Sequence, residues 1–512
     1  MKKIQTNLTK AVRYLIQVWN KTVTQVKGVK YIEYYLLLVI LIGAFGVRLY
    51  KIDNPLADWH SWRQSDTAAV SRIYMDEGID VFTPRYYDIS AIQTGLSNPE
   101  GYRFVEFPFF NVIHATLAKN IPLSGFTNPF EVWGRLISIV CALVTCVFLF
   151  LLGRKLMGVM GGIWAAGFYA FLPYNIFFTR VILPEPMTAM TATIALYYFV
   201  QFIENGEKRD IILSAIFFSC AMLLKPYIAF YGVPMLYLAI QKYGFKKMFT
   251  NKLLLTASSI VIIPLLLWRF RLQMHPEGIP FYKWAFNGDK IRFKPAFWNW
   301  IFGERIGRLI LGVWGLIPFV MGLLVPTQEA RKERYKWFIQ YCLLGVFLYV
   351  AIVATANVRH DYYQAITVPL ICLALAQGSL YLWEAKNFNK WISRGILILS
   401  IGVMLIVSSL QVREYYKIDH PEIIEAGKAA DTLLPKDALV IAPYNGDTAF
   451  LYQTKRRGWP FVELPIPELI QKGASYWISV NFGDPQTIQV MNEYTVIQQT
   501  PSYVIVDLTK PK

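Results

Sequence analysis

Apolar runs long enough to cross a membrane alternate with short polar segments along most of the chain. A transmembrane helix needs about 20 predominantly apolar residues. The pattern therefore predicts about eleven transmembrane helices and an all-α polytopic membrane protein. The predicted spans lie near residues 34–49, 134–153, 159–178, 187–203, 211–224, 227–241, 253–269, 307–325, 337–354, 365–383 and 392–410.

Two polar regions lie before and after the first of these spans. Residues 1–30 carry Lys and Arg but no acid, and their apolar positions recur at helical spacing. This pattern predicts a basic amphipathic helix on the cytoplasmic surface of the membrane. Residues 51–130 are largely polar and too long for an ordinary connection. They are therefore predicted to form a large first outer loop.

Residues 411–512 have the pattern of a small soluble α/β domain. Short runs rich in β-branched and aromatic residues predict strands, and the stretches between or before them predict helices. The predicted strands are residues 437–444, 476–480, 494–497 and 503–508, and the predicted helices are residues 421–434 and 466–472. This domain has no glycine-rich phosphate loop, so we assign it no nucleotide.

The distribution of charge predicts the orientation of the chain. The net charge is +17, from 51 basic and 34 acidic residues, and short basic loops follow the even-numbered spans. These loops are all cytoplasmic if the N-terminus is cytoplasmic, as the positive-inside rule requires. The C-terminal domain is then extracytoplasmic. The basic loops are residues 154–155, 208–209, 242–252, 331–336 and 386–394.

Composition narrows the class of protein. The chain is 55% hydrophobic and 17% charged, whereas soluble domains carry about 25% charged residues. Its basic residues lie in short loops, which indicates a multi-pass cell-membrane protein in contact with membrane lipid and argues against nucleic acid as a partner. All five cysteines lie in apolar runs, which predicts neither a disulfide framework nor a zinc site built on cysteine. About thirty polar and basic residues precede the first span, so we expect no cleavable signal peptide.

The predicted outer ends of the spans hold nearly all the unusual polar residues. They occur in residues 58–67, 106–108, 180–186, 225–227 and 359–363. Glu185 is a strong candidate for function, because an unpaired carboxylate between two prolines at the mouth of an apolar run is costly. The other residues also have ordinary explanations. Lys225 could snorkel to the interface, Tyr362 and Tyr363 could belong to an aromatic belt, and the acids could belong to a solvated loop.

Taken together, these segments suit one kind of chemistry. Carboxylates with Lys, Arg and His at a membrane surface fit an anionic lipid headgroup whose phosphate leaves during a reaction. Cations or a metal would stabilise the departing phosphate, and a carboxylate would take a proton from an acceptor hydroxyl. The sequence contains no Ser-His-Asp elbow, Walker loop or HExxH motif that would support a competing chemistry.

The same segments resemble those of a known superfamily. A first span, a long outer loop that opens with acidic residues, many further spans and a soluble C-terminal domain resemble the GT-C glycosyltransferases. Within them the chain is similar to the bacterial family 39 and aminoarabinose-transferase-like branch, which is related to protein mannosyltransferases. The resemblance covers roughly residues 30–410 and is carried by HSWRQSDTAAVSR (60–72), EFP (106–108), RVILPEP (180–186), LLKPY (223–227) and RHDYY (359–363).

The resemblance implies a GT-C transmembrane catalytic domain over residues 31–410 that transfers a sugar with inversion. The donor would be a polyprenyl-phosphate sugar, and the acceptor a lipid-linked glycan, a polysaccharide or a protein outside the cytoplasm. It implies Asp66 or Asp58 as the catalytic base and Glu185 as a second catalytic acid. The Asp-Glu pair usual in protein mannosyltransferases is absent, because Trp59 and Thr67 stand at the second positions.

The remaining site residues follow from the same resemblance. A divalent metal (Mg, Mn or Zn) would be held by Asp66 and Glu185. The residues expected at the donor phosphate are Lys225, Arg359, His360, Tyr362, Tyr363 and Arg63. The residues expected at the acceptor are His60, Trp62, Glu106 and Arg180.

Two other classes of function stay open at the level of sequence. A lipid or solute transporter, or a flippase, would place charges near the membrane midplane and show repeat symmetry between its halves. Here the charges lie at the predicted outer face, and the two halves show no repeat. If the protein were a non-catalytic membrane scaffold, the grouping of carboxylates with Lys, Arg and His that suits a phosphate would be a coincidence.

Overall fold

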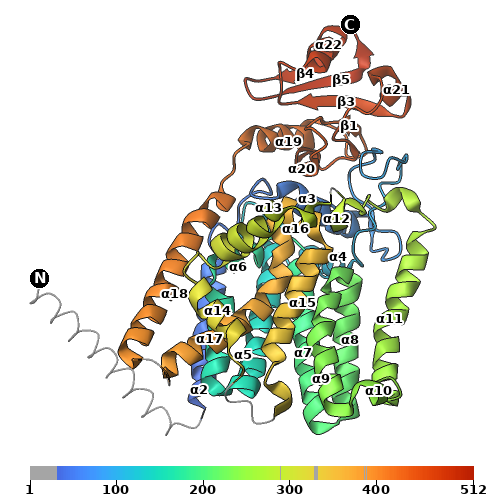
Figure 1. Ribbon diagram of the computed structural model, residues 1–512. Helices are drawn as coiled ribbons and strands as arrows, with labels where there is room; N and C mark the ends of the chain where they lie inside the picture. Colours follow the sequence, from blue (N-terminus) through green and yellow to red (C-terminus); the bar gives the residue numbers. More distant parts are fainter. Residues whose placement is uncertain (1–30, 289, 328–332, 386, 388) are drawn as a thin grey trace, which may run out of the picture.

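A bundle of long helices carries a small sheet domain at one end (Figure 1). This computed structural model describes residues 31–288, 290–327, 333–385, 387 and 389–512. The amphipathic helix predicted for residues 1–30 lies outside the described residues. The described chain begins at the end of the bundle farthest from the sheet domain (Figure 1).

The bundle is built from helices joined by short helical turns. The long helices are α2 (Ile32–Arg48), α5 (Pro129–Phe171), α7 (Glu185–Asn205), α8 (Lys208–Leu224), α9 (Gly232–Tyr243), α11 (Lys252–Leu272), α14 (Leu316–Leu324), α15 (Phe338–Ile352), α17 (Val368–Glu384) and α18 (Lys390–Val412). The connecting segments are α6 (Pro173–Phe178), η1 (Pro226–Tyr231), α10 (Phe245–Met248), η2 (Pro276–Gly278), α12 (Trp284–Asn287), η3 (Ile291–Phe293), α13 (Pro295–Trp298), η4 (Asn299–Ile310), η5 (Glu333–Tyr335), α16 (Ala354–Arg359), η6 (Asp361–Thr367) and η7 (Arg413–Tyr416).

Several helices are both long and apolar enough to cross a membrane. In the described part of the chain there are six such stretches. This supports a helical membrane protein, whereas the expected number of about eleven spans stays a prediction. The six stretches are Pro129–Phe171, Glu185–Asn205, Lys252–Leu272, Glu333–Ile352, Asp361–Glu384 and Lys390–Leu433.

One predicted span, residues 307–325, is interrupted. The π-helical segment η4 ends at Ile310, irregular turns follow, and α14 has nine residues. Gly312 turns the chain with φ +49°, and a Cβ at that position would lie 2.2 Å from the carbonyl oxygen of Met404 in α18. The hydropathy pattern does not detect this break, because the apolar residues continue through it.

Two of the predicted spans, 134–153 and 159–178, meet at Gly158 inside α5. This glycine has φ 75° and ψ −179°, so α5 consists of two helices joined at a sharp bend. The backbones on either side of the bend come into contact. A Cβ at Gly162 would lie 2.5 Å from the carbonyl oxygen of Phe150. Residues without a side chain therefore permit this close helical hairpin.

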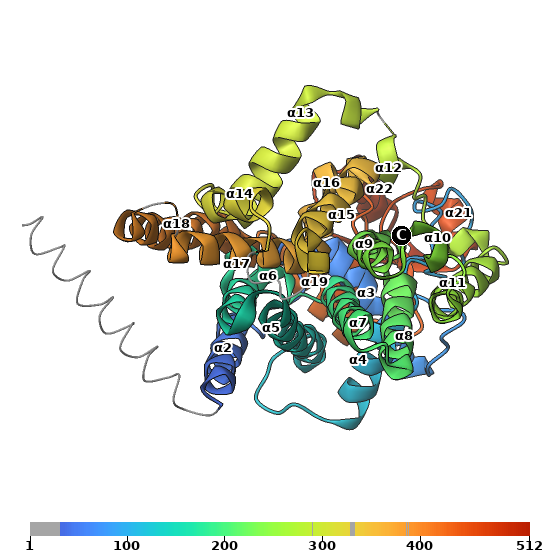
Figure 2. The same ribbon diagram turned by 60° about the horizontal axis from the view of Figure 1, so that its bottom comes forward.

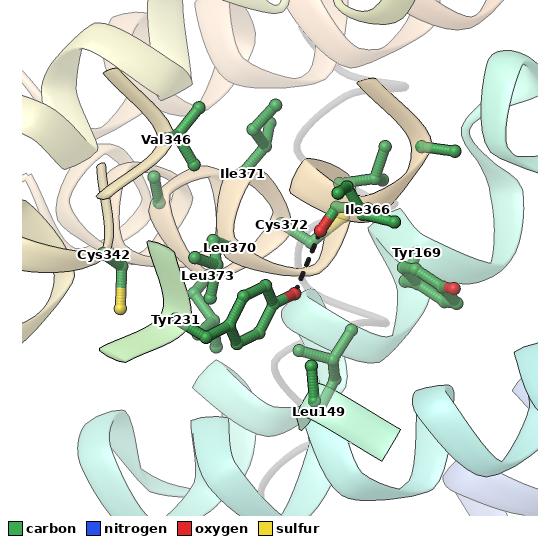
Figure 3. Close-up of a cluster of buried hydrophobic side chains, with 14 of the residues drawn as sticks. Leu149, Tyr169, Tyr231, Cys342, Val346, Ile366, Leu370, Ile371, Cys372 and Leu373 are labelled. Atoms are coloured by element: carbon green, nitrogen blue, oxygen red, sulfur yellow. Dashed lines mark hydrogen bonds between the residues drawn. The ribbon is translucent and has the colours of Figure 1, made fainter. Parts of the chain in front are cut away.

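Apolar side chains from helices distant in sequence fill the centre of the bundle (Figure 3). Leu149 of α5, Cys342 of α15 and Leu373 of α17 are fully buried there. The hydroxyl of Tyr231, also buried, donates to the backbone carbonyl of Ile366 at 3.1 Å (Figure 3). This bond satisfies a polar group that would otherwise be costly to bury, and it ties the start of α9 to the start of α17.

The predicted first outer loop contains two helices, α3 (Ser61–Glu77) and α4 (Phe109–Asn120). Every residue of α3 from Arg63 to Tyr74 is buried. The helix is covered by α4 and by α20 (Thr448–Thr454) of the C-terminal domain. The polar residues of α3 therefore lie in an interior rather than on a solvated surface.

The C-terminal domain contains a five-stranded mixed sheet in the order β2-β1-β3-β5-β4. Strands β2, β1 and β3 are parallel, and β5 runs antiparallel to both β3 and β4. All four predicted strands are found, and β2, α20 and α22 are additional. The elements are β1 (Leu439–Ile441), β2 (Gly458–Trp459), β3 (Ala474–Ser479), β4 (Tyr494–Gln499), β5 (Val504–Pro511), α19 (Pro421–Leu433), α21 (Ile466–Gln471) and α22 (Pro485–Glu493).

The C-terminal domain is docked by backbone hydrogen bonds on residues 51–130, the predicted outer loop, which we call the first outer segment after that prediction. Gly458 of β2 donates to the carbonyl of Tyr87 at 2.9 Å and accepts from the amide of Ile89 at 3.0 Å. A shared apolar core also joins α3 to α19 and α20. The first outer segment and the C-terminal domain therefore lie at the same end of the bundle (Figure 1).

Candidate active site

A cavity of about 690 Å³ lies where the helix bundle meets the first outer segment. The first outer segment contributes aromatic and charged side chains, including Trp62, Arg63 and Glu106. The bundle contributes an apolar surface from η1, α9 and α15. That surface is formed by Ala229, Phe230, Val233, Leu348, Ile352 and Val353. The cavity therefore joins a charged region to an apolar surface of the bundle.

Cations dominate the charged part of the cavity. Among the described residues, Arg63, Arg103, Lys225 and Arg269 line it against one carboxylate, Glu106. Arg269 comes from the last turn of α11, a helix at the edge of the bundle beside α8 (Figure 2). Arg63, Arg103 and Lys225 are each paired with a carboxylate, so within the described residues the surplus of positive charge comes from Arg269. This surplus next to apolar walls favours an amphiphilic anion.

Lys225 and Glu185 form a buried ion pair, and local sequence positions both residues. Helix α8 ends at Leu224 because a residue before proline avoids the helical conformation. Lys225 is accordingly extended, with φ −153°. Glu185 opens α7 between two prolines, where proline is tolerated and the helix dipole favours a carboxylate.

The surroundings of this ion pair are aromatic. Lys225 Nζ lies 5.3 Å from the ring centroid of Tyr362 and 4.9 Å from that of Tyr363. Both rings line the cavity. Glu185 Oε2 is buried without a hydrogen-bond partner among the described residues. The pair therefore keeps one carboxylate oxygen available beside a lysine at the cavity wall.

Arg63 and Glu106 form a second pair at the cavity wall. One guanidinium nitrogen of Arg63 contacts both carboxylate oxygens of Glu106 at 2.9 Å. Burial disfavours the charge of Arg63, but Glu106 outweighs this effect, so the pKa of the guanidinium is raised. The next residue, Phe107, donates its amide to the carbonyl of Leu223 at 3.0 Å. That bond places the EFP segment against the LLKPY segment.

Asp66 lies behind the cavity wall with both carboxylate oxygens engaged. Arg103 Nη2 contacts one oxygen at 2.6 Å, and the hydroxyl of Thr448 donates to the other at 2.7 Å. Arg103 lines the cavity, whereas Asp66 itself borders a small adjoining pocket. The carboxylate is thus one side chain away from the main cavity.

Asp58 lies in a separate charged cluster. Its Oδ1 accepts from Gln64 at 2.7 Å, and its Oδ2 lies 3.9 Å from both Arg135 and Arg180. All three charged side chains are fully buried. Arg180 also donates to the carbonyl of Lys51 at 2.7 Å. This arrangement holds the first outer segment against α5 and the α6–α7 connection.

Asp361 is a hydrogen-bonding centre that the sequence analysis did not single out. Its carboxylate accepts from Trp59 Nε1 at 3.1 Å and from the hydroxyl of Tyr415 at 2.5 Å, and it contacts His60 Nε2 at 2.6 Å. Arg305 lies 3.6 Å away. The network joins the start of α3, the start of η6 and η7, which leads to the C-terminal domain.

His360 and Arg359 lie beside this network and do not line the cavity. The His360 ring is 5.7 Å from that of His60, and the Arg359 guanidinium is 5.6 Å from the ring of Trp284. Burial, reinforced by His60, lowers the pKa of His360 to about 4. The imidazole is therefore neutral at pH 7 and could offer a hydrogen bond rather than a charge.

The expected divalent metal has little support from the donor set. Within the described ranges, no three His, Cys, Asp or Glu side chains are grouped as metal ligands. Asp66 is occupied by Arg103 and Thr448, and Glu185 by Lys225. These residues do not fit a metal held by the protein alone, so we derive no step through a metal.

The structure brings six of the predicted residues to one cavity. These are Trp62, Arg63, Glu106, Lys225, Tyr362 and Tyr363. Glu185 and Asp66 adjoin it through their ion-pair partners, Lys225 and Arg103. The sequence analysis missed Arg103, Arg269 and Asp361. Asp361 stands inside the RHDYY segment, which was its one available signal, whereas the two arginines stand in no distinguishing motif.

Comparison with known proteins identifies the fold to which this site belongs. Residues 124–268 match the family model described as dolichyl-phosphate-mannose-protein mannosyltransferase. The crystal structure of ArnT from Cupriavidus metallidurans bound to undecaprenyl phosphate superposes with a TM-score of 0.57 at 12% identity. That match covers 93% of this chain and 98% of the ArnT chain. The chain has the GT-C glycosyltransferase fold.

A second structure of the GT-C class agrees. The apo crystal structure of the Archaeoglobus fulgidus oligosaccharyltransferase matches with a TM-score of 0.56 at 11% identity, over 91% of this chain and 73% of the other. A comparison with curated protein sequences gives no match. The GT-C fold implied by the sequence resemblance is confirmed, and ArnT is among the structures that share this fold over nearly the whole chain.

Proposed function

We propose that the protein is a membrane glycosyltransferase that moves a sugar from a polyprenyl-phosphate donor to a cell-envelope acceptor. The transfer takes place at the outer face of the membrane and inverts the configuration of the sugar. The observation that carries this proposal is the 690 Å³ cavity, in which cations adjoin an apolar wall. A polyprenyl phosphate has the same two parts, an anionic head and an apolar chain.

The structural neighbours support this choice of donor. The ArnT structure is described as bound to undecaprenyl phosphate. A structure of the archaeal oligosaccharyltransferase AglB is described as a complex with an inhibitory peptide and a dolichol-phosphate. Both lipids combine a phosphate with a polyisoprenoid chain. The acceptor of the present protein is a glycan, a lipid or a protein, and the neighbours do not decide among them.

The charged residues of the cavity have distinct roles in the proposed reaction. Lys225 and Arg63, with Arg269, neutralise the phosphate as it leaves the sugar. Such contacts accelerate transfer if they strengthen as negative charge develops on the leaving oxygen. Tyr362 and Tyr363 hold Lys225 in position through their ring faces. Donor binding would draw Lys225 away from Glu185 and towards the phosphate.

A carboxylate takes the proton from the acceptor hydroxyl in this scheme. Asp66 and Asp58 are the predicted bases, with Glu185 as the second acid. Asp66 Oδ1 would take the acceptor proton at its second lone pair while Thr448 keeps donating to the same oxygen. Asp58 is held between two buried arginines and lies farther from the cavity lining. We therefore favour Asp66, or Glu185 once Lys225 has moved to the phosphate.

The proposed sidedness rests on the distribution of charge between the two ends of the bundle. Arg154 pairs with Glu33 near the start of α2, at the end opposite the C-terminal domain. The α9–α11 connection, with Lys246 and Lys247, lies at that same end (Figure 1). Short basic segments favour the cytoplasm. The cavity and the C-terminal domain would then be extracytoplasmic.

The decisive experiment measures release of free polyprenyl phosphate. Purified protein in detergent or nanodiscs is incubated with undecaprenyl-phosphate-linked sugars and an extract of envelope glycans. Sugar transfer with stoichiometric release of undecaprenyl phosphate is expected, and Lys225→Ala should abolish it. A transporter would instead move the intact lipid or a solute across a vesicle without cleaving it. Intact donor in every mixture, together with such movement, would overturn the proposal.

A further inference from the structure

A second and larger cavity lies between the helix bundle and the C-terminal domain. It has a volume of about 1340 Å³, about twice the 690 Å³ of the candidate active site. We call it the domain cleft, and it is lined by the end of α3, the start of α5, α19 and residues 436–439 and 455–457. Ligand sites in proteins occur preferentially at such domain interfaces.

Three cations in the domain cleft share one carboxylate. Asp431 of α19 contacts Lys455 Nζ at 2.7 Å and Arg456 Nη1 at 3.1 Å, and it also pairs with Lys436. Lys428, one turn before Asp431 on α19, lines the same cleft. Asp76 and Asp437 also line the cleft, so the four cations face three carboxylates and keep a surplus of one positive charge.

In this cluster Arg456 is held in place by the protein, whereas the side chains of Lys436 and Lys455 are exposed and can move. Arg456 is 1% exposed, and the carbonyls of Leu434 and Pro435 accept from its guanidinium at 2.8 and 2.6 Å. The side chains of Lys436 and Lys455 are 76% and 45% exposed. Exposed ion pairs of this kind are weak. An incoming anion could therefore replace Asp431 as their partner at little cost.

A second observation in the domain cleft also points to a ligand. Arg72 of α3 is 93% buried (7% exposed) and lines the cleft. Its Nη2 contacts Glu131 at 2.6 Å and the Tyr452 hydroxyl at 2.7 Å. Its Nε has no hydrogen-bond partner among the described residues. A buried donor without a partner is costly, so a ligand oxygen or an ordered water is expected next to it.

The remaining side chains suit a sugar more than a simple anion. The rings of Tyr87 and Phe130 line the domain cleft, but the Arg72 guanidinium at 4.6 Å and the His114 ring at 4.3 Å already pack on Phe130. The carboxylates of Asp76 and Asp437 also line it, and they can accept from sugar hydroxyls. Glu77 is neutralised by Arg457, whose guanidinium contacts both of its oxygens at 2.7 Å.

We propose that the domain cleft binds an anionic segment of the acceptor glycan, which carries phosphate or carboxylate groups. The lysines Lys428, Lys436 and Lys455 bind the anion, and the carboxylates of Asp76 and Asp437 accept from the sugar hydroxyls. This inference rests on the proposed glycosyl transfer. Helix α3 connects the two sites, since Arg63 lines the active-site cavity and Arg72 the cleft. Nine residues of helix separate them by about 14 Å.

This separation suits a polymeric or branched acceptor. Its anionic segment would be held in the cleft, while the acceptor continues along α3, which spans about 14 Å between Arg72 and Arg63. Binding energy gained there can orient the reacting hydroxyl without direct contact between the cleft and the donor. The C-terminal domain would thereby take part in the choice of acceptor.

Binding of defined oligosaccharides to the full-length detergent-solubilised protein tests the proposal. The probes are a phosphorylated mannan oligosaccharide, an oligogalacturonide and a neutral maltohexaose, each measured by microscale thermophoresis. At least one anionic probe should bind, and the neutral probe should bind about tenfold more weakly or not at all. The two anionic probes separate phosphate from carboxylate as the recognised group. Failure of both, or equal binding of all three, would overturn the proposal.

Two triple variants distinguish binding in the domain cleft from a general effect of the protein's positive charge. Lys428→Ala/Lys436→Ala/Lys455→Ala should weaken the anionic probe about tenfold, the sum expected of three partly exposed ion pairs. The matched control removes three lysines that do not line the cleft, Lys472, Lys510 and Lys512, and should bind as the wild type does. Equal weakening in both triple variants, or none in either, would contradict the assignment.

A variant that should bind the anionic probe more tightly keeps the test valid even if other variants bind weakly because they misfold. Asp431→Asn removes the competing carboxylate from Lys436 and Lys455, so the anionic probe should bind about threefold tighter or better. Unchanged or weaker binding in the folded variant speaks against the exchange of Asp431 for a ligand anion. All these measurements need no donor. Binding of an anionic probe, together with intact donor in the separate donor-release assay, would refute the glycosyltransferase proposal and leave the cleft proposal standing.

Discussion

The hydroxyl of Thr448 donates a hydrogen bond to Asp66 Oδ1 at 2.7 Å. Asp66 stands in the first outer segment and Thr448 opens α20 of the C-terminal domain. The same hydroxyl also lies 3.2 Å from the carbonyl of Trp62, and Trp62 lines the candidate active-site cavity. The C-terminal domain thus contacts the predicted catalytic base directly.

Thr448→Val should lower the rate of sugar transfer. The variant keeps the shape of the side chain but leaves one oxygen of buried Asp66 without a donor. A hydrogen bond to a charged group is worth about 1.5–3 kcal/mol, so we expect a loss of roughly tenfold or more in kcat/KM. Thr448→Ser restores the hydroxyl and should restore most of the activity. Equal activity of the Val and Ser variants would show that the bond has no role in transfer.

Glu185→Gln should abolish transfer and also destabilise the protein. Breaking a buried ion pair costs about 3–5 kcal/mol, because Lys225 is left without its partner. Glu185→Gln/Lys225→Met removes both charges, so its apparent melting temperature should recover part of the loss while transfer stays undetectable. Melting followed by intrinsic fluorescence, together with the donor-release assay, separates the two effects. Transfer by the double variant at wild-type rates would exclude both residues from the mechanism.

Arg269→Ala should raise the KM for the lipid-linked donor while affecting kcat less. The guanidinium lines the cavity from the last turn of α11, where it would contact the donor phosphate. Charge-assisted contacts of this kind are stronger than neutral ones, so we expect a KM about tenfold higher. Arg271→Ala is the matched control, since Arg271 lies on the same turn but does not line the cavity. Similar KM values in the two variants would argue against a donor contact.

His114 should make the protein less stable in acid. Burial lowers the pKa of its imidazole from 6.5 to about 4, and Nε2 lies 2.7 Å from the carbonyl oxygen of Phe130. As the pH falls from about 6.5 to about 4, the unfolded chain takes up a proton that the folded chain excludes. The free energy of unfolding therefore decreases by up to about 3 kcal/mol.

The difference between wild type and His114→Gln isolates this effect in denaturation experiments at several pH values. Asp88 supplies a contrast of opposite sign, because burial raises the pKa of its carboxyl group to about 7. Its folded state binds more protons than the unfolded state between pH 3.8 and about 7, so stability from this group is lost as the pH rises. Asp88→Asn should accordingly gain relative to wild type with increasing pH. Parallel stability curves for wild type and His114→Gln would refute the prediction for His114.

The sequence by itself determined the class of architecture. Apolar runs of spanning length predict membrane helices because the bilayer leaves backbone groups no other partner. Short runs rich in β-branched and aromatic residues near the C-terminus predicted the strands, and the motifs around Asp66, Glu185 and Lys225 indicated the GT-C resemblance. These signals are local in the chain, so hydropathy, spacing and proline positions are enough to read them.

The tertiary structure decided which charged groups act together. Lys225 and Glu185 lie 40 residues apart in sequence, and Asp66 and Thr448 lie 382 apart. No periodic pattern encodes such pairs, because each depends on how separate helices and domains pack. Packing also placed Asp58 between two arginines and brought Arg269 from α11 into the cavity. Charged residues of the same type therefore either form buried ion pairs that hold segments together or line the cavity. Which of the two occurs depends on tertiary contacts that the sequence pattern does not contain.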